Sequence, residues 1–152
     1  MSVDFYVAVP ATNWPTPVAM QQCMADHAYP VRLKRFPALS EELVVTDGSL
    51  AVIDGKDAYL EGELAKSPAI QDTTDEINDR LSASAATERV KKSDVIMSLR
   101  VRSAVEMRAA SYVISALIVC FDGFGFEPQG NTYGRAEFVQ SLMGGVEVLK
   151  GL

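Results

Sequence analysis

Few residues in this 152-residue chain have side chains suited to chemistry. His27 is the single histidine, and Cys23 and Cys120 are the only cysteines. A Ser-His-Asp or Cys-His catalytic arrangement would have to use His27, which falls on the apolar stripe of an expected helix and is interpreted as structural. A closed zinc site needs four ligands, and one histidine with two cysteines far apart in the sequence does not supply them. We therefore expect no cofactor, no metal site and no enzymatic activity, and we expect both cysteines to be small buried apolar side chains rather than redox groups.

Acidic residues gather in the polar segment that follows residue 70. They are Asp72, Asp75, Glu76 and Asp79. Carboxylates can bind calcium or magnesium, but this cluster lacks the loop spacing and central glycine of a calcium-binding loop. We interpret it as the solvated face of a helix.

The segment 57–64, DAYLEGEL, alternates between apolar and polar positions, as a half-solvated strand does. Its even-numbered residues face the expected core, whereas Tyr59, Glu61 and Glu63 face solvent. Two carboxylates in a cleft can do acid–base work, but nothing in this pattern indicates the burial that would raise the pKa of one of them. We expect this solvated face, with Asp57 at its start, to contact a partner.

Trp14 lies between Asn13 and Pro15 in an expected loop. A tryptophan on a loop is a candidate for partner contact, and it can equally fold back as a lid on the core. Both interpretations stay open. The partner-binding candidates are Trp14, Asp57, Tyr59, Glu61 and Glu63.

The charge balance narrows the class of partner. The net charge is −6 and the sequence pI is about 4.8, which argues against nucleic acid because phosphate binding needs a basic face. It is compatible with a basic protein partner. Two small basic groups lie on expected strands, at Arg32, Lys34 and Arg35 and at Arg100 and Arg102. Each group can meet a carboxylate or keep a strand soluble.

Composition and length indicate one globular domain over residues 1–152. Apolar residues make up 48% of the chain and charged residues 22%, as in ordinary soluble domains, and this length suffices for one core. The opening MSVDFYVAVP has an acid at position 4 and no basic n-region, so we expect no export signal and a cytoplasmic location.

Periodicity and turn signals predict the elements. Strands are expected at 3–9, 31–36, 43–46, 50–53, 57–64, 95–102 and 124–128, and helices at about 17–28, 73–81, 103–121 and 135–143. Thr16 before a proline is a helix start, and capping boxes begin at Thr73 and Ser103. The two adjacent glycines Gly144 and Gly145 are expected to end the last helix. Residues 82–93 are expected to form a flexible polar loop.

The apolar run 109–121 is the most hydrophobic part of the chain. It lies between Arg108 and Asp122, so it is shorter than the roughly 20 residues that span a membrane. We interpret it as a central buried helix, apolar nearly all round, and we expect no membrane association. Gly123 and Gly125 follow this helix, whereas a phosphate-binding loop precedes one, so they indicate a helix stop and a turn.

The element order predicts an α+β fold. A mostly antiparallel sheet would carry its helices on one face. Two β-α-β units, one at each end of the chain, could give a ferredoxin-like layout.

The sequence resembles small bacterial toxin-immunity proteins, which act as antidotes to secreted or contact-delivered toxins. The resemblance rests on the opening FYVAVP with its Thr-Pro helix start, the Asp-Gly turns, and the long helix AASYVISALIVCFDG followed by FEPQG. It implies a non-enzymatic inhibitor that binds a basic toxin through an acidic surface. It transfers no particular residue to a role.

Two other interpretations stay open. A pocket between sheet and helices could bind a small molecule or serve an unusual enzyme. An exposed strand edge could hold a homo-oligomer together.

Overall fold

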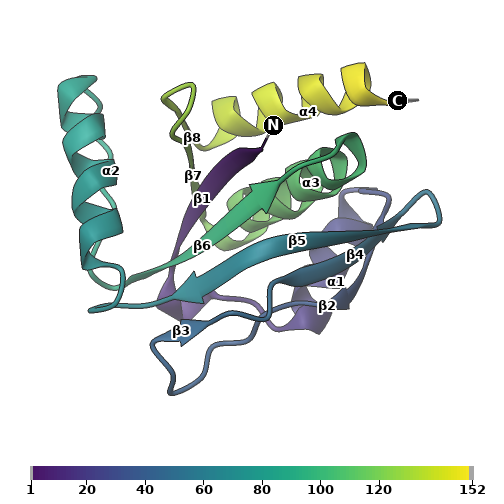
Figure 1. Cartoon of the computed structure of the whole chain (residues 1–152), viewed down its shortest axis with the longest axis horizontal. Coiled ribbons are helices and arrows are strands. Elements are labelled where there is room, and N and C mark those ends of the chain that lie inside the picture. The colour runs from purple at the N-terminus through teal and green to yellow at the C-terminus, as the bar shows by residue number, and fades with distance from the viewer. Residues whose placement is uncertain (1, 151–152) are drawn as a thin grey trace.

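The computed structural model describes residues 2–150, which form four α-helices and an eight-stranded sheet (Figure 1). The elements in chain order are β1 (Val3–Pro10), the short 3-10 helix η1 (Ala11–Asn13), α1 (Pro17–Asp26), β2 (Val31–Arg35), β3 (Val44–Val45), β4 (Ser49–Ile53), β5 (Lys56–Ala65), α2 (Gln71–Ala83), β6 (Asp94–Val101), α3 (Ala104–Phe121), β7 (Phe124–Glu127), β8 (Thr132–Gly134) and α4 (Ala136–Leu149).

The sheet is antiparallel throughout its strand pairs. Its order is β2-β4-β5-β6-β1-β7-β8, and β3 pairs with the end of β5. The connection β6-α3-β7 crosses over β1, which pairs with both strands. This is the split β-α-β unit of a ferredoxin-like layout, and the hairpin β4–β5 widens the sheet between β6 and β2. The predicted α+β class with a mostly antiparallel sheet is confirmed.

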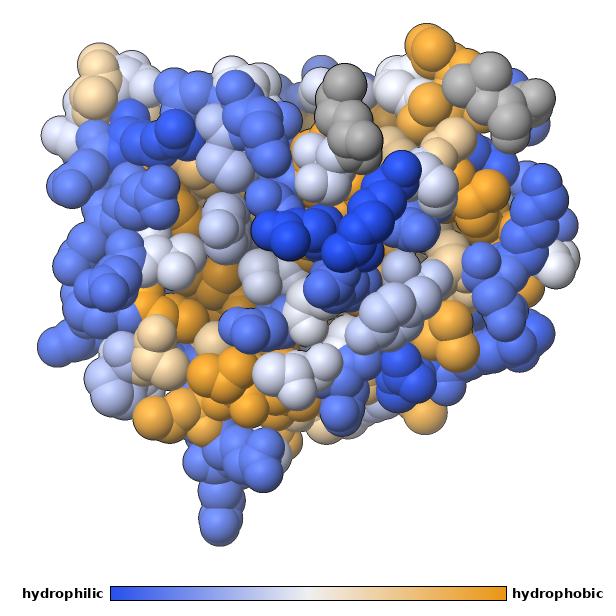
Figure 2. All heavy atoms as spheres, in the orientation of Figure 1, coloured by the Kyte–Doolittle hydropathy of each residue, from blue (hydrophilic) through white to orange (hydrophobic). Residues whose placement is uncertain are grey.

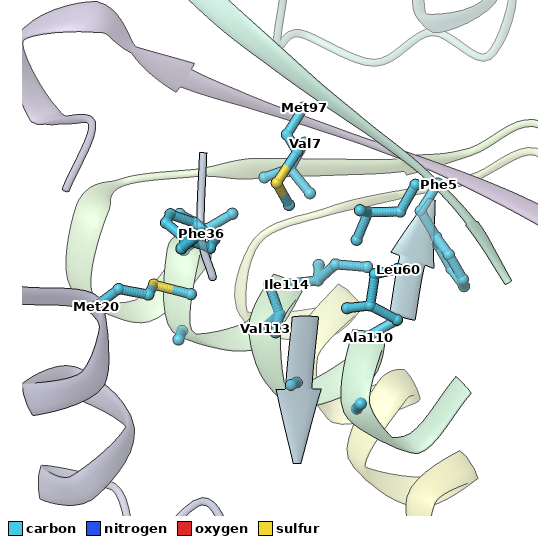
Figure 3. Close-up of a cluster of buried hydrophobic side chains, with 14 of the residues drawn as sticks. Phe5, Val7, Met20, Phe36, Leu60, Met97, Ala110, Val113 and Ile114 are labelled. Carbon is cyan, nitrogen blue, oxygen red and sulfur yellow. The ribbon is translucent and has the colours of Figure 1, made fainter. Parts of the chain in front are cut away.

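The main core lies between the sheet and the helices α1, α3 and α4, which gather on one face. Figure 3 shows Val7 of β1 and Met97 of β6 pointing toward Val113 and Ile114 of α3. All four side chains are almost completely buried. The helix α3 packs on the sheet and is also contacted by α1 and α4. These contacts on several sides explain why its side chains are apolar nearly all round.

The helix α2 packs on the opposite face, at one end of the sheet. Successive residues of a strand face opposite sides, so Ala8 and Ile96 point away from Val7 and the main core. They form a second apolar cluster with Ile77 of α2. This helix therefore covers only part of the second face and leaves the rest open (Figure 1).

Among the helices of residues 2–150, only α3 is long and apolar enough to span a membrane. Inside the protein, however, 61% of that span is buried. The burial of Ala109, Val113, Leu117 and their neighbours agrees with the predicted central core helix. No membrane is needed to explain its apolar character.

A hairpin expected between residues 43–46 and 50–53 is wrong, because β3 pairs with β5 and not with β4. The hairpin expected between β4 and β5 and the expected start of α3 are both confirmed. Asp54 and Gly55 both have positive φ, 52° and 73°, as a tight two-residue hairpin turn between β4 and β5 requires. At the start of α3, the Ser103 side chain accepts from the N–H of Glu106 at 3.2 Å. The Glu106 carboxylate in turn accepts from the N–H of Arg102 at 3.0 Å.

Several predicted element ends are wrong. The helix α2 begins at Gln71, two residues before the capping box expected at Thr73, and its N-cap makes no side-chain bond. The helix α4 continues through Gly144 to Leu149. Val146 is buried, and this tertiary contact outweighs the weak preference of glycine for leaving a helix. The strand β8 lies outside the strands expected from the sequence, and it forms by pairing with β7.

The polar segment after α2 is anchored at two points. Asn78 accepts from the N–H of Val90 at 2.8 Å and donates to its carbonyl at 2.9 Å. Arg135, just before α4, donates to the Glu88 carboxylate at 2.9 Å. These hydrogen bonds limit how far the loop can move. The flexibility expected for residues 82–93 stays a prediction.

The interpretation of the cysteines as simple apolar side chains is wrong. Cys23 of α1 and Cys120 of α3 form a disulfide. The helices meet there because Met20, Cys23 and Met24 make the buried stripe of α1. His27, expected on this stripe, is instead the exposed C-cap of α1.

Candidate functional site

A polar cavity of about 490 Å³ lies on the open face of the sheet, beside α2. Figure 2 shows a mostly hydrophilic surface over these strands. The cavity is lined by residues of β1, β5, β6, α2 and the turn after β3: Asp4, Tyr6, Thr46, Tyr59, Glu61, Gly62, Glu63, Thr73, Ser98, Leu99 and Arg100. Because α1, α3 and α4 cover the other face, this is where the sheet itself is available to a ligand.

Strand register brings the polar side chains into rows across three strands. Arg100 of β6 is the partner position of both Glu61 on β5 and Asp4 on β1. In the next row, Ser98 lies between the positions of Glu63 and Tyr6. Side chains opposite one another on antiparallel strands interact directly, so each row works as a unit.

Two ion pairs hold the arginines of this face. Arg100 Nε donates to Asp4 Oδ1 at 2.9 Å, and this hydrogen bond and the charge of Asp4 raise the pKa of Arg100. Arg102 pairs with Glu61. Among residues 2–150, Glu63 forms no ion pair, so its carboxylate is left available on the surface.

Tyr6 marks the acidic end of the cavity. Partial burial raises the pKa of its hydroxyl, and the negative charges of Asp4 and Glu76 raise it further, against the lowering effect of Arg100. Glu76 belongs to α2, so a carboxylate from the flanking helix acts on the same space as the strand residues. The Tyr6 hydroxyl is therefore held protonated, in the same row as Ser98 and Glu63.

Three of the five predicted contact residues lie together in this cavity. Tyr59, Glu61 and Glu63 line it, and the prediction that they face away from the core is confirmed. Asp57 is on the same strand face but outside the lining, and it accepts from Lys34 Nζ at 3.0 Å. Their role in partner binding stays a prediction.

Trp14 is not part of this site. Its ring stacks on Phe36, with centroids 5.3 Å apart, and its Nε1–H donates to the carbonyl of Pro37 at 3.0 Å. Of the two interpretations left open for Trp14, the structure shows the one in which its ring folds back as a lid on the core.

Sequence reasoning assigned no residue of β1 or β6 to a site, although it named Arg100 as a group that can meet a carboxylate, as it does in its pair with Asp4. Asp4, Tyr6, Ser98 and Arg100 all occupy outward positions of strands that were predicted. Their alternation was therefore visible, but their meeting with Glu61 depended on β1 and β6 lying next to β5. Strand order is a long-range property, and one sequence carries little signal for it.

The cavity offers charged groups and hydroxyls and no buried pair of carboxylates. General acid–base catalysis by two carboxylates needs burial that separates their pKa values, and here Glu61 is paired with Arg102 while Glu63 is exposed. An array of charges, hydroxyls and two tyrosines suits hydrogen bonding and ion pairing with another molecule.

Comparisons with protein-family models, with curated proteins and with solved structures find no match to this chain.

Proposed function

We propose that the protein is a non-enzymatic binding protein that takes a basic segment of a protein partner on the open face of its sheet. The observation that carries this proposal is the polar cavity across β5, β6 and β1, with Glu63 unpaired among the described residues and Glu76 nearby. A lysine or arginine of the partner would meet Glu63 while Tyr6 and Tyr59 supply amphipathic contact area.

Charge supports a basic partner at two levels. The chain carries a net charge of −6, which steers a basic molecule toward it. Within the cavity, the ion pairs of Asp4 and Glu61 satisfy the arginines of the face. The remaining carboxylates can then bind an incoming cation without first being released from an internal pair.

The antidote role belongs to the same proposal. An immunity protein blocks its toxin by binding alone, so it needs a specific surface and no catalytic centre. A cytoplasmic location is the expected one for such a protein. The Cys23–Cys120 disulfide argues against it, because disulfides persist mainly in oxidising compartments. Cell fractionation combined with thiol alkylation would show both the location and the state of the cysteines.

The test combines growth rescue with measured affinity. The product of the adjacent gene is expressed with and without this protein, and the dissociation constant of the purified pair is measured by calorimetry. Glu63→Lys should weaken binding at least about tenfold, since it replaces attraction by repulsion at a contact. Raising the salt concentration should weaken the wild-type complex, because exposed charges are screened.

A matched variant controls for net charge. Glu147→Lys makes the same charge change on α4, at an exposed position on the helical face. It should leave affinity and rescue near wild-type values. Equal losses in both variants, or rescue that survives Glu63→Lys unchanged, would contradict a site on the open face.

A second candidate function is small-molecule binding, which the size of the cavity favours. A volume of about 490 Å³ lies in the range of ligand pockets. The lining is polar, with Leu99 its only aliphatic side chain, so the ligand would be charged or rich in hydroxyl groups. A thermal-shift screen of such compounds tests this role, and a shift abolished by Glu63→Gln but kept in Glu147→Gln would support it.

A further inference from the structure

Cys23, His27 and Cys120 form a compact cluster of metal-ligand side chains away from the open face. One ligand atom from each residue lies within 4.8 Å of the others. Cys23 and His27 are one helical turn apart at the end of α1, and Cys120 comes from the last turn of α3. In this structure the two sulfur atoms are joined as a disulfide.

The spacing of the donor atoms suits a tetrahedral ion. Zinc binds thiolate sulfur at about 2.3 Å and imidazole nitrogen at about 2.0 Å. Tetrahedral angles then put sulfur and nitrogen about 3.5 Å apart, and two sulfurs about 3.8 Å apart. His27 Nδ1 lies 3.8 Å from Cys120 Sγ, so the imidazole is already near its place, and separation of the two sulfurs would open the centre of the cluster.

We propose that, in the reduced protein, Cys23, Cys120 and His27 bind a soft divalent ion of the zinc class. A dithiol reductant delivers two electrons and two protons to the disulfide, which becomes two thiols while the reductant becomes a disulfide. The ion then displaces one proton from each thiol and takes the lone pair of the neutral imidazole. Two thiolates and one imidazole are the ligand types that zinc prefers.

The surroundings of His27 fit a ligand role. Its Nδ1 lies 3.0 Å from the carbonyl oxygen of Cys23, so in the disulfide form Nδ1 carries a proton and donates it. On metal binding this proton would move to Nε2, so that Nδ1, the nitrogen next to Cys120 Sγ, binds the ion through its lone pair. The ring is at the surface, so solvent can carry the proton from one nitrogen to the other.

The site would be open on its solvent side. Three protein ligands leave the fourth tetrahedral position to water, so the ion is more exchangeable than in a site with four protein ligands. The bound ion would connect α1 to α3 where the disulfide connects them under oxidising conditions. The pairing of these two helices would thus be maintained in either redox state.

The test uses the full chain and Co²⁺ as a spectroscopic probe. The protein is reduced with a phosphine, freed of the reductant without oxygen, and titrated with Co²⁺. We expect one equivalent to bind, with a thiolate-to-cobalt charge-transfer band and the intense visible bands of a tetrahedral ion. The oxidised protein should show neither band. Zn²⁺ should displace the cobalt and raise the melting temperature of the reduced protein.

Variants separate the ligands from general effects. Cys120→Ser should lose most of the charge-transfer intensity and the Zn²⁺-induced thermal shift. His27→Gln should keep charge transfer but weaken binding by at least roughly tenfold, since even outer partners of metal ligands contribute that much. Glu147→Gln, on the exposed side of α4, should bind as the wild type does.

Three results would overturn the proposal. They are a reduced wild-type protein without charge transfer, a His27→Gln variant with wild-type affinity, and a thermal shift that persists in Cys120→Ser. Circular dichroism covers the case in which reduction unfolds the chain. Refolding on addition of Zn²⁺ would then support the site, and a chain that stays unfolded with Zn²⁺ would count against it.

Discussion

Gly62 of β5 has no room for a side chain against the backbone of β6. A Cβ atom at this position would lie 1.7 Å from the carbonyl oxygen of Ser98. Because the obstacle is backbone, it cannot move aside as a flexible side chain would. We predict that Gly62→Ala lowers the free energy of unfolding by about 1–3 kcal/mol, measured by urea denaturation. An unchanged midpoint would show that the two strands separate easily here.

The raised pKa of Tyr6 predicts that the free energy of unfolding falls at alkaline pH. Burial and the charges of Asp4 and Glu76 raise its folded-state pKa above 10.0, so the folded chain keeps the proton at pH values where the unfolded chain has lost it. This contribution to stability is complete below pH 10.0 and is lost as the pH rises through the folded-state pKa.

The Tyr6→Phe variant isolates this effect. Tyr29 and Tyr112, whose pKa values burial also raises, are the same in both proteins. The free energy of unfolding of Tyr6→Phe should therefore fall less steeply than that of the wild type as the pH rises above 10.0. Parallel curves would mean that the Tyr6 hydroxyl is in the same environment in the folded and unfolded chains.

At the residue scale, prediction from sequence succeeded where a local pattern decides the outcome. The alternation of β5 was sufficient to turn Tyr59, Glu61 and Glu63 outward. It failed for Cys23 and Cys120, which are 97 positions apart. Only the packing of α1 on α3 shows that their sulfur atoms meet.

The helix α4 contains two adjacent glycines in its interior. A Cβ atom added to Gly144 would meet no atom within 4 Å, and glycine in a helix costs about 0.5–1 kcal/mol relative to alanine. We predict that Gly144→Ala raises the free energy of unfolding by this amount, with a matching rise in the denaturation midpoint. Destabilisation instead would indicate that α4 ends at Gly144 in solution.

Element boundaries were less predictable than element types. The start of α3 was found because the Ser103 cap is a local hydrogen bond. The end of α4 was missed because the burial of Val146 against the rest of the protein extends the helix. The strand β8 was missed for a similar reason, since it exists through its pairing with β7.

The sheet places the first strand of the chain in its interior, between β6 and β7. Both neighbours of β1, the strands β6 and β7, come after residue 93. We predict that a fragment of residues 1–93 does not fold, because β1 has no partner and the core lacks α3. Circular dichroism should show no cooperative thermal transition. A cooperative transition would mean that this half is a separate domain, against the prediction of one domain over 1–152.

The sequence predicted the α+β class and the two β-α-β units because each depends on the order of elements. It did not predict the strand order, the position of α2 on the second face, or the cavity that both create. These depend on which distant segments pair, and loop-closure and packing energies determine such choices with little local signal.

The open face and the core use alternate residues of the same strands, β1, β5 and β6. A substitution at an outward position such as Glu63 therefore leaves the side chains that pack against α3 unchanged. Selection can alter the charge pattern of this face one residue at a time while the scaffold persists. Duplicated copies of the gene would diverge first at these outward positions, so a new binding specificity could evolve without a new fold.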